Sequence, residues 1–354
     1  MRQHNITLIP GDGVGPEVIS SAVRCIEAAG VSVNWEERTA GENAETPFPA
    51  DVVESVKKNM VALKGPITTP VGEGFRSVNV AMRKTLNLFA NVRPVKSYEG
   101  APAIYKNLDI VLIRENTEDL YCGIEFEKGR DDTQRLIRLV EETKKVELTP
   151  DTAVSLKVIS EHASDRIVQF AFEYIKTNKR KKLTAVHKAN ILKFSDGVFL
   201  QAARKAAIRN PRIQFEDKMV DTMAMQLVQK PYDYDVVVLP NLYGDIISDL
   251  CAGLVGGLGF APSGNFGFNR ALFEPVHGSA PKYAGKDVIN PCAAILSGVM
   301  MLRHIGEAHA AGLIEGSLVR VLKEGKCVTK DISDKNPVGT KRMTEEILKH
   351  IKKS

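Results

Sequence analysis

Two aspartates four residues apart form the most informative polar pair in the chain. Asp245 and Asp249 lie in the segment NLYGDIISDL, so that on a helix both carboxylates would project from one face. Like charges this close repel each other unless a cation or a proton lies between them, and oxygen ligands suit Mg²⁺ or Mn²⁺. The alternative is that Asp245 only caps the helix. Asp221, a polar residue in the apolar segment MVDTMAMQLV, is a third candidate ligand.

Arginines with nearby serine and asparagine form a second group. Arg83, Arg93 and Arg114 lie in the segments RSVNVAMRKTLNLFANVRP and IRENTEDLYCGIE, beside apolar stretches. A helix that begins near Ser77 would place Asn79 and Arg83 on one face. A single arginine is more often a surface charge, but guanidinium groups bind carboxylates through two parallel hydrogen bonds. Three of them in this setting predict a pocket for a substrate with two or three carboxylates.

Lys188 follows a strand-like run in the segment AVHKANI. A lysine in this place can be partly desolvated and lose its proton near neutral pH, as a base for alcohol oxidation requires. A solvated loop lysine explains the same local sequence, and both interpretations stay open. The glycines of Gly11–Pro16 also follow a strand, but their spacing is wrong for a Rossmann dinucleotide fingerprint. They predict a strand-to-helix turn near a ligand.

The elements that would position these residues alternate along the chain, in the order of an α/β fold. The expected strands are 6–9, 31–35, 60–63, 110–113, 184–186 and 236–239, and the expected helices are 17–29, 51–59, 164–177 and 197–208. The segment 122–160 mixes charges with β-branched residues around a proline, which predicts an arm of paired strands. The glycine-rich stretch GLVGGLGFAPSGNFG requires unusual backbone angles or close packing before a final helical region.

The composition excludes several classes of protein. With 44% hydrophobic and 26% charged residues in 354, the chain is an ordinary globular protein and not a disordered one. The net charge is only +5, and the basic cluster Lys179–Lys182 is better explained as a solvated turn than as a nucleic-acid site. No apolar run is as long as a membrane span, and because the first residues lead directly into a strand-like run we expect no signal peptide, although a transit peptide could have been removed. Five scattered cysteines indicate reduced thiols in a bacterial cytoplasm or a mitochondrial matrix. We therefore expect a soluble protein without nucleic-acid or membrane partners.

Together these segments resemble the β-decarboxylating dehydrogenases, the family of isocitrate, homoisocitrate and 3-isopropylmalate dehydrogenases. The similarity covers almost the whole chain and rests on KGPITTPVGEGFRSVNVAMRK, ANVRP, RENTEDLYCGIE, AVHKANI, NLYGDIISDL and FEPVHGSAPKYAGKDVINP, in this order. It implies two α/β domains with a clasp arm, a fold distinct from the classical Rossmann fold. The implied large domain is 1–90 with 256–354, the small domain 91–118 with 161–255, and the clasp arm 119–160. It also implies a homodimer or higher oligomer whose active sites are shared between subunits.

The resemblance further implies a substrate and a reaction. Ser77 and Asn79 look like the pair that selects isocitrate, because isopropylmalate enzymes carry apolar residues there and homoisocitrate enzymes another arginine. The implied reaction is the oxidation and decarboxylation of isocitrate to 2-oxoglutarate. Lys188 would be the base and Tyr121 the acid that protonates the product. The implied ligands of the substrate carboxylates are Arg83, Arg93 and Arg114, and those of Mg²⁺ or Mn²⁺ are Asp245 and Asp249, with Asp221 from the neighbouring subunit, which would also supply Lys188.

The implied oxidant is NAD⁺ or NADP⁺, bound on the loop HGSAPKYAGKDVIN. The expected cofactor contacts are Thr69, Asn190, His277, Gly278, Lys282, Tyr283 and Asn290. Lys282 and Tyr283 resemble the pair that meets the 2′-phosphate in NADP enzymes, whereas NAD enzymes of the family usually carry Asp and an aliphatic residue. Lys330 and Asp334 argue against this, because some bacterial NADP enzymes carry Tyr and Arg there. The balance of these residues favours NADP.

Two alternatives stay open within the resemblance. The first is homoisocitrate or 3-isopropylmalate dehydrogenase. The second is a regulatory subunit that binds isocitrate or a nucleotide without performing chemistry. Such subunits typically lack part of the catalytic set, all of which is present here: Tyr121, Lys188, Asp221, Asp245 and Asp249.

Overall fold

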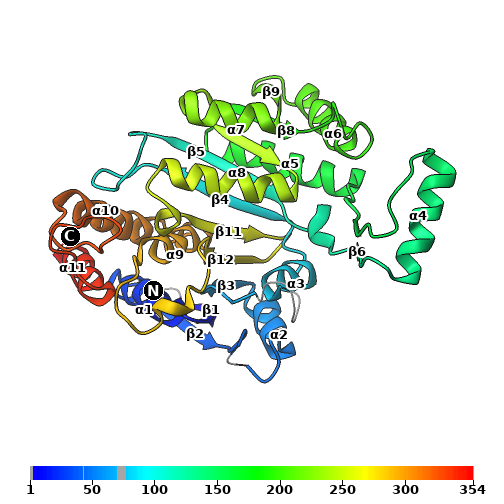
Figure 1. Ribbon diagram of the computed structural model, residues 1–354. Coiled ribbons are helices and arrows are strands. Elements are labelled where there is room, and N and C mark those ends of the chain that lie inside the picture. Colours follow the sequence, from blue (N-terminus) through cyan, green and yellow to red (C-terminus); the bar gives the residue numbers. More distant parts are fainter. Residues whose placement is uncertain (1–2, 43, 70–76, 354) are drawn as a thin grey trace.

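The computed structural model describes residues 3–42, 44–69 and 77–353. Within these residues ten strands form one sheet, with helices on both faces (Figure 1). The strand order is β2-β1-β3-β12-β11-β4-β5-β10-β8-β9. The α/β fold class is therefore confirmed, while the predicted domain boundaries stay a prediction.

The sheet has two parallel halves joined by antiparallel strands. The parallel strands of the first half are β2 (Val33–Glu37), β1 (His4–Ile9), β3 (Val61–Lys64) and β12 (Ala271–Pro275). Those of the second half are β5 (Asp109–Glu115), β10 (Val236–Leu239), β8 (Lys182–His187) and β9 (Gln214–Met219). Between them lie β11 (Pro262–Phe266) and β4 (Ala90–Lys96), paired antiparallel with each other and with their neighbours. The two halves consequently run in opposite directions.

The alternation of side chains along each strand assigns the helices to the two faces of the sheet. In β5, Val111 and Ile113 pack with α5 and α6, whereas Ile110 and Leu112 pack with α7 and α8. In the first half, one face packs with α1, α9, α10 and α11 and the other with α2 and α3. Phe266 of β11 contacts the cores around both α5 and α9, which places these two helices on the same face.

The helix bounds agree with the sequence pattern wherever a helix was predicted. The helices of one face are α1 (Gly15–Ala28), α5 (Glu161–Thr177), α6 (Ser195–Arg209), α9 (Cys292–His304), α10 (Ala308–Glu324) and α11 (Thr340–Lys353). Those of the other face are α2 (Ala50–Asn59), α3 (Val78–Thr85), α7 (Val220–Gln229) and α8 (Asn241–Leu254). Every predicted strand and helix is present with its ends moved by a few residues, but β4, β9, β11 and β12 were not predicted. In the described part of the chain, no helix combines the length and apolar character that a bilayer crossing requires.

An arm projects from the body between η1 (Asp119–Cys122) and α5 (Figure 1). At its base β6 (Glu125–Phe126) pairs antiparallel with β7 (Val154–Ser155), and α4 (Asp131–Lys144) lies farther out. The prediction of paired strands is therefore correct for the base and wrong for the outer part. The apolar residues Leu136, Ile137, Leu139 and Val140 have helical spacing, which decides the conformation there.

The turn between β1 and α1 depends on Gly13. Its φ of +56° is left-handed, and the next residue, Val14, donates its N–H to the carbonyl oxygen of Ser279 at 2.9 Å. A Cβ atom at Gly13 would lie 2.1 Å from that oxygen. The turn is thus a close backbone approach between two distant segments, and not a phosphate-binding loop of the Rossmann type.

We predict that Gly13→Ala lowers the free energy of unfolding by about 2 to 4 kcal/mol, because the new methyl group meets a backbone oxygen at a left-handed φ. Urea unfolding followed by circular dichroism at fixed protein concentration measures this. Gly312→Ala is the control, since that position lies within α10 with no atom near its added Cβ, and stability should be equal or slightly higher. Equal midpoints for both variants would contradict the packing described for this turn.

Candidate active site

The candidate catalytic residues follow the ends of four neighbouring parallel strands. Tyr121 lies in η1 after β5, and Asp245 lies in α8 after β10. Lys188 comes directly after β8, and Asp221 lies in the first turn of α7 after β9. Open α/β sheets bind ligands at the carboxyl ends of their strands, so the fold gathers these side chains where chemistry is expected.

Asp245 is the centre of the first group of polar side chains. It pairs with Arg114, its Oδ1 lies 3.5 Å from Arg93 Nη2, and the Tyr121 hydroxyl donates to its Oδ2 at 2.5 Å. Burial alone would raise the pKa of Asp245, but the positive charges of Arg114 and Arg93 outweigh it and the pKa is lowered. Asp249, one turn along α8, has a pKa that is raised, first by burial and further by the charge of Asp245. Arg93 Nη1 lies 3.6 Å from Asp249 Oδ1 and lowers this pKa in part, so the two carboxylates of α8 share one guanidinium group.

Both arginines reach α8 from the strands beneath it. Arg114 is 1% exposed and its Nε donates to Asn241 at 2.9 Å, while Arg93 Nη1 donates to Ser248 at 2.5 Å. Gly244 permits this contact, because a Cβ atom there would lie 2.5 Å from Arg114 Cγ. Sequence reasoning missed Asn241 and Ser248, although Ser248 follows Asp245 by three residues and helical spacing could have found it.

Arg83 on α3 is held by a buried acid–base pair. Its Nη2 lies 3.1 Å from Glu274 Oε1, and Lys64 Nζ lies 2.6 Å from Glu274 Oε2. Burial would raise the pKa of Glu274, but Lys64 and Arg83 lower it to about 2, so it is ionised. Sequence reasoning missed Lys64 and Glu274, for which the only signal is a charged residue at the end of an apolar strand.

Asn79 and Ser77 lie where the spacing predicted, at the start of α3. Ser77 is the residue before the helix and accepts a hydrogen bond from the exposed Thr69 at 3.2 Å. A cavity of about 90 Å³ is lined by Asn79, Arg83, Arg93, Ser263, Glu274, His277 and Gly278, among others. The motif GEGFR and the rest of 70–76 lie outside the described residues.

Among the described residues, three that line this cavity have an unpaired buried polar atom, and so does Arg114, which lies beneath α8 and does not line the cavity. In the described part of the chain, Asn79 Oδ1, Arg83 Nε, Arg114 Nη2 and His277 Nε2 are buried without a hydrogen-bond partner. Buried polar groups are normally paired, so an amide oxygen and two guanidinium groups without partners indicate the place of a polar ligand. The guanidinium N–H groups suit a carboxylate, and the amide oxygen suits a hydroxyl donor.

A larger cavity of about 790 Å³ adjoins the first through His277 and Gly278, which line both. Four of the predicted cofactor residues line it: His277, Gly278, Tyr283 and Asn290. Val14 from the turn after β1 lines it too, as do Lys330, Asp331 and Asp334. Lys282 is not among its lining residues, and its ammonium lies 4.9 Å from the centre of the Tyr283 ring. Asn290 donates to Asp331 at 3.0 Å.

Lys188 and Asp221 form a separate group. Lys188 Nζ donates to Asp221 Oδ1 at 2.6 Å, and this hydrogen bond lowers the pKa of Asp221. Asn190 is exposed in the same loop and does not line the 790 Å³ cavity. Among the residues that the structure describes, no three His, Cys, Asp or Glu side chains gather as a metal site. The three predicted metal ligands are thus divided between α7 and α8 within one chain.

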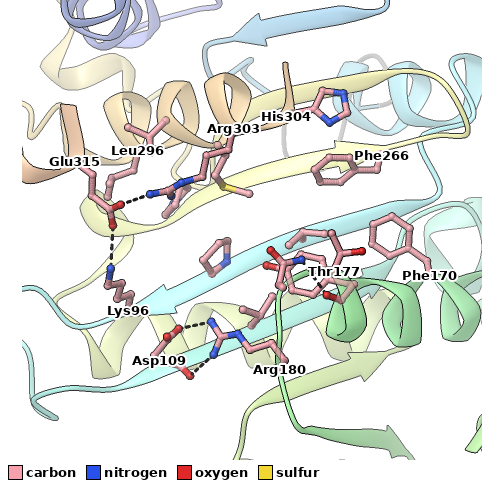
Figure 2. Close-up of a pocket in the computed structure, with 18 of the residues that line it drawn as sticks. Lys96, Asp109, Phe170, Thr177, Arg180, Phe266, Leu296, Arg303, His304 and Glu315 are labelled. Atoms are coloured by element: carbon pink, nitrogen blue, oxygen red, sulfur yellow. Dashed lines mark hydrogen bonds and ion pairs between the residues drawn. The ribbon is translucent and has the colours of Figure 1, made fainter. Parts of the chain in front are cut away.

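Another groove, of about 590 Å³, lies between α5 and α9 (Figure 2). Its floor includes Val92 and Pro94 of β4, and because side chains alternate along a strand, Arg93 faces away from it. Lys96 and Arg303 both pair with Glu315 at one end of the groove (Figure 2). It therefore lies on the opposite face of the sheet from the candidate active site.

Comparisons with known proteins agree with this geometry. The family model of isocitrate/isopropylmalate dehydrogenase matches residues 5–347. The chain is 45% identical over 352 residues to the alpha subunit of mitochondrial isocitrate dehydrogenase (NAD) of Homo sapiens, covering 98% of this chain and 90% of that protein. It is 46% identical over 350 residues to a regulatory subunit of mitochondrial isocitrate dehydrogenase (NAD) of Dictyostelium discoideum, covering 99% and 92%.

The crystal structure of isocitrate dehydrogenase from Methylococcus capsulatus superimposes with a TM-score of 0.91 at 46% identity, covering 99% of both chains. A match of this extent in sequence and in fold includes both halves of the sheet and the arm. The chain belongs to the isocitrate/isopropylmalate dehydrogenase family.

Proposed function

We propose that the protein catalyses the metal-dependent oxidative decarboxylation of isocitrate to 2-oxoglutarate and CO₂. The observation that carries the proposal is the set of unpaired buried atoms on Asn79, Arg83 and Arg114 beside the acidic pair of α8. Two guanidinium groups suit carboxylates, and the Asn79 amide oxygen can accept from a hydroxyl, which together suit a small hydroxy acid with several carboxylates. The polar Ser77 and Asn79 at the start of α3 favour isocitrate over the isopropyl group of isopropylmalate, and α3 carries no second arginine for homoisocitrate.

Asp245 and Asp249 would hold Mg²⁺ or Mn²⁺ together with Asp221 of a second copy of the chain. The fit rests on the donor set, because these are hard carboxylate oxygens. Within one chain the two on α8 share Arg93, whose Nη2 lies 3.5 Å from Asp245 Oδ1 and whose Nη1 lies 3.6 Å from Asp249 Oδ1. When bound, the metal would make the substrate hydroxyl more acidic and stabilise the negative charge that decarboxylation leaves on its oxygen. Arg93 and Arg114 keep Asp245 ionised for this role.

Tyr121 and Lys188 would move the protons. Burial raises the pKa of Tyr121, so its hydroxyl stays protonated and can donate its proton to the carbon that loses CO₂. Asp245 orients that hydroxyl, and the Arg114 guanidinium lies 4.7 Å from the centre of the Tyr121 ring. Lys188 Nζ lies within hydrogen-bond distance of Asp221, so a proton taken from the substrate hydroxyl can pass between them.

A homodimer would complete the site, because one chain separates Lys188 and Asp221 from Asp249. Apolar side chains are exposed on α7 and α8: Met225 at 48%, Val228 at 49% and Ile246 at 58%. Burying them between two copies across a twofold axis would bring Lys188 and Asp221 of each copy to the other's Asp245. The five cysteines are free thiols, which suits a reducing compartment such as the mitochondrial matrix, and the human relative is a mitochondrial protein.

We propose NAD⁺ as the preferred oxidant, in place of the NADP⁺ that Lys282 and Tyr283 favour. The names of the human and Dictyostelium relatives both contain NAD and give the NADP preference no support. Asp331 and Asp334 line the 790 Å³ cavity, where carboxylates would accept ribose hydroxyls and repel a 2′-phosphate.

A regulatory role is the second candidate function, because the Dictyostelium relative is named as a regulatory subunit. A protein of this kind would bind isocitrate or a nucleotide at the same cavities without turnover. The complete set of Tyr121, Lys188 and the three aspartates favours catalysis.

Complementation between two inactive variants tests the shared site. We expect Lys188→Met to lower kcat by roughly 10³-fold and Tyr121→Phe by roughly 10²-fold, since each removes a proton-transfer group. Each hybrid dimer of the two variants contains one complete site out of two, and random re-association of equal amounts makes about half of the dimers hybrid, so about one quarter of the wild-type activity should return. Turnover is followed by reduced nicotinamide absorbance with isocitrate and Mn²⁺.

The control for complementation is each variant taken through the same re-association alone, which should stay inactive. If the mixture is no more active than its components, the two residues act within one chain and the proposed dimeric site is wrong. Wild-type protein that binds isocitrate without turnover would favour the regulatory function.

Asp249→Asn should raise the Mn²⁺ concentration needed for half-maximal rate by roughly 10- to 100-fold, because it removes one anionic oxygen ligand. Metal titration of the rate at saturating isocitrate measures this. Asp233→Asn, at an acid in η2 (Pro231–Asp233) outside the site, is the control and should leave the titration unchanged. An unchanged metal requirement in Asp249→Asn would remove Asp249 from the ligand set.

The cofactor proposal predicts that kcat/KM is at least roughly tenfold higher with NAD⁺ than with NADP⁺, corresponding to about 1.4 kcal/mol or more. The double variant Lys282→Asp/Tyr283→Ile should lower the NADP⁺ rate further and leave the NAD⁺ rate nearly unchanged. Initial rates of the wild-type protein and the double variant, measured with NAD⁺ and with NADP⁺, decide between the two cofactor preferences. Higher kcat/KM with NADP⁺ that falls in the double variant would reinstate the preference expected from the sequence.

A further inference from the structure

A lysine at the end of the arm joins two buried aspartates beneath the candidate active site. Lys157, which follows β7, has its Nζ 3.0 Å from Asp119 Oδ1 and 3.3 Å from Asp196 Oδ1. The centre of the Tyr243 ring lies 4.4 Å from the same ammonium. Both aspartate side chains are 0% exposed and Lys157 is 14% exposed. One ammonium therefore balances two carboxylates that water does not reach.

Asp119 ties this ion triad to the segment of Tyr121. Its φ is +70°, and its Oδ1 accepts the N–H of Leu120 at 2.8 Å within η1. Its Oδ2 accepts the N–H of Leu242 at 2.9 Å, in the first turn of α8. Asp119 thus fixes the place of Tyr121 relative to the helix that carries Asp245.

Asp196 ties the triad to the segment of Lys188. It lies in the first turn of α6, and its Oδ2 accepts the backbone N–H of Lys188 at 2.6 Å. Asp196 therefore holds the backbone of Lys188 with one carboxylate oxygen and contacts the Lys157 ammonium with the other.

We propose that Lys157 is a positioning residue for both the acid and the base of the reaction. Its ammonium sets the separation between the Tyr121 segment and the Lys188 segment by holding one buried carboxylate on each. This rests on the proposed function, in which Tyr121 acts in the site of its own chain and Lys188 in the site of the partner. Within each subunit the triad would then connect the segment that serves its own active site with the segment that serves the active site of the partner. The arm is attached to this triad, because the arm ends at Lys157.

The effect of removing the ammonium follows from electrostatics. Two carboxylates without a counter-ion in a dry interior repel each other, so the segments they hold must move apart or admit water. A displacement of about 1 Å in a catalytic group can cost up to roughly 10²-fold in rate. The substrate-binding residues on α3 and β4 do not contact the triad, so isocitrate affinity should change less.

The test uses Lys157→Met, the conservative Lys157→Arg, and Lys205→Met as a matched control. Lys205 forms an exposed ion pair with Glu161 at 3.2 Å, and its loss should change nothing. We expect Lys157→Met to lower kcat for isocitrate by at least roughly tenfold while KM for isocitrate stays within about threefold, and Lys157→Arg to recover most of kcat. Lys157→Met with kcat within about twofold of wild type, or with its loss in KM alone, overturns the proposal.

A second variant guards against misfolding of Lys157→Met. Lys157→Met/Asp196→Asn leaves one buried carboxylate in place of two, and its asparagine oxygen can still accept the Lys188 N–H. It should fold with native circular dichroism and still show a low kcat, because no ammonium links the two segments even though the repulsion is gone. Wild-type kcat in this variant would assign the loss in Lys157→Met to charge repulsion alone and overturns the proposal. Absence of isocitrate turnover in the wild-type protein would instead overturn the proposed function itself, so the two failures are distinguishable.

Hybrid dimers separate the two ends of the triad. In the pair Lys188→Met with Tyr121→Phe, one chain supplies Tyr121 and the other supplies Lys188 to the single complete site. Lys157→Met placed in either chain should lower the rate of that site by several-fold relative to the parent hybrid. An effect from only one of the two placements would show that Lys157 positions only one segment, contrary to the proposal.

Discussion

The burial of two guanidinium groups beneath α8 is the constraint on which the candidate site depends. Arg93 and Arg114 enter from β4 and β5, almost fully buried, where an unpaired charge would cost several kcal/mol. Their partners Asn241, Asp245 and Ser248 all lie in α8, so this helix must rest across both strands. The same contacts leave Asp245 ionised and bonded to Tyr121. The need to balance the charge of these two buried arginines thus positions Asp245 as the proposed metal ligand and Tyr121 as the proposed proton donor. It also positions the arginines themselves as proposed substrate ligands.

The other half of the sheet repeats this arrangement with different residues. Lys64 and Glu274 are buried at the ends of β3 and β12, and Glu274 holds Arg83 toward the 90 Å³ cavity. The two parallel halves meet at β11 and β4, and Arg93 of β4 lines the same cavity as Arg83 and Glu274. In each half an ion pair inside the protein replaces water around an arginine, and one buried N–H group of that arginine has no partner among the described residues. In the triad around Lys157, too, buried charged groups are balanced by one another and not by water. It lies beside the segments that carry Tyr121 and Lys188.

Sequence reasoning succeeded where a local period determines structure. The spacing of Asp245 and Asp249 and of Asn79 and Arg83 predicted the faces of α8 and α3 correctly, and the apolar runs of β5, β8 and β10 were recognised. It failed for β9, whose sequence QFEDKM carries charges, and for β11, whose sequence PSGNF lacks strand-like residues, because pairing with neighbouring strands decides both. The ion partners Glu274 and Asp196 could not be predicted, because each lies on a different element from the groups it holds and no local period connects them. The arm helix α4 was missed although its apolar spacing is helical.

The chemistry at the edge of β5, β10 and β8 decides between the proposed enzyme and its alternatives. The most direct measurement is the yield of 2-oxoglutarate and CO₂ per reduced nicotinamide when the purified protein is incubated with isocitrate, Mn²⁺ and NAD⁺, with and without EDTA. We predict equal amounts of all three products and their loss when EDTA removes the metal. Nicotinamide reduction without release of CO₂, or the same yield in the presence of EDTA, would contradict the proposed reaction.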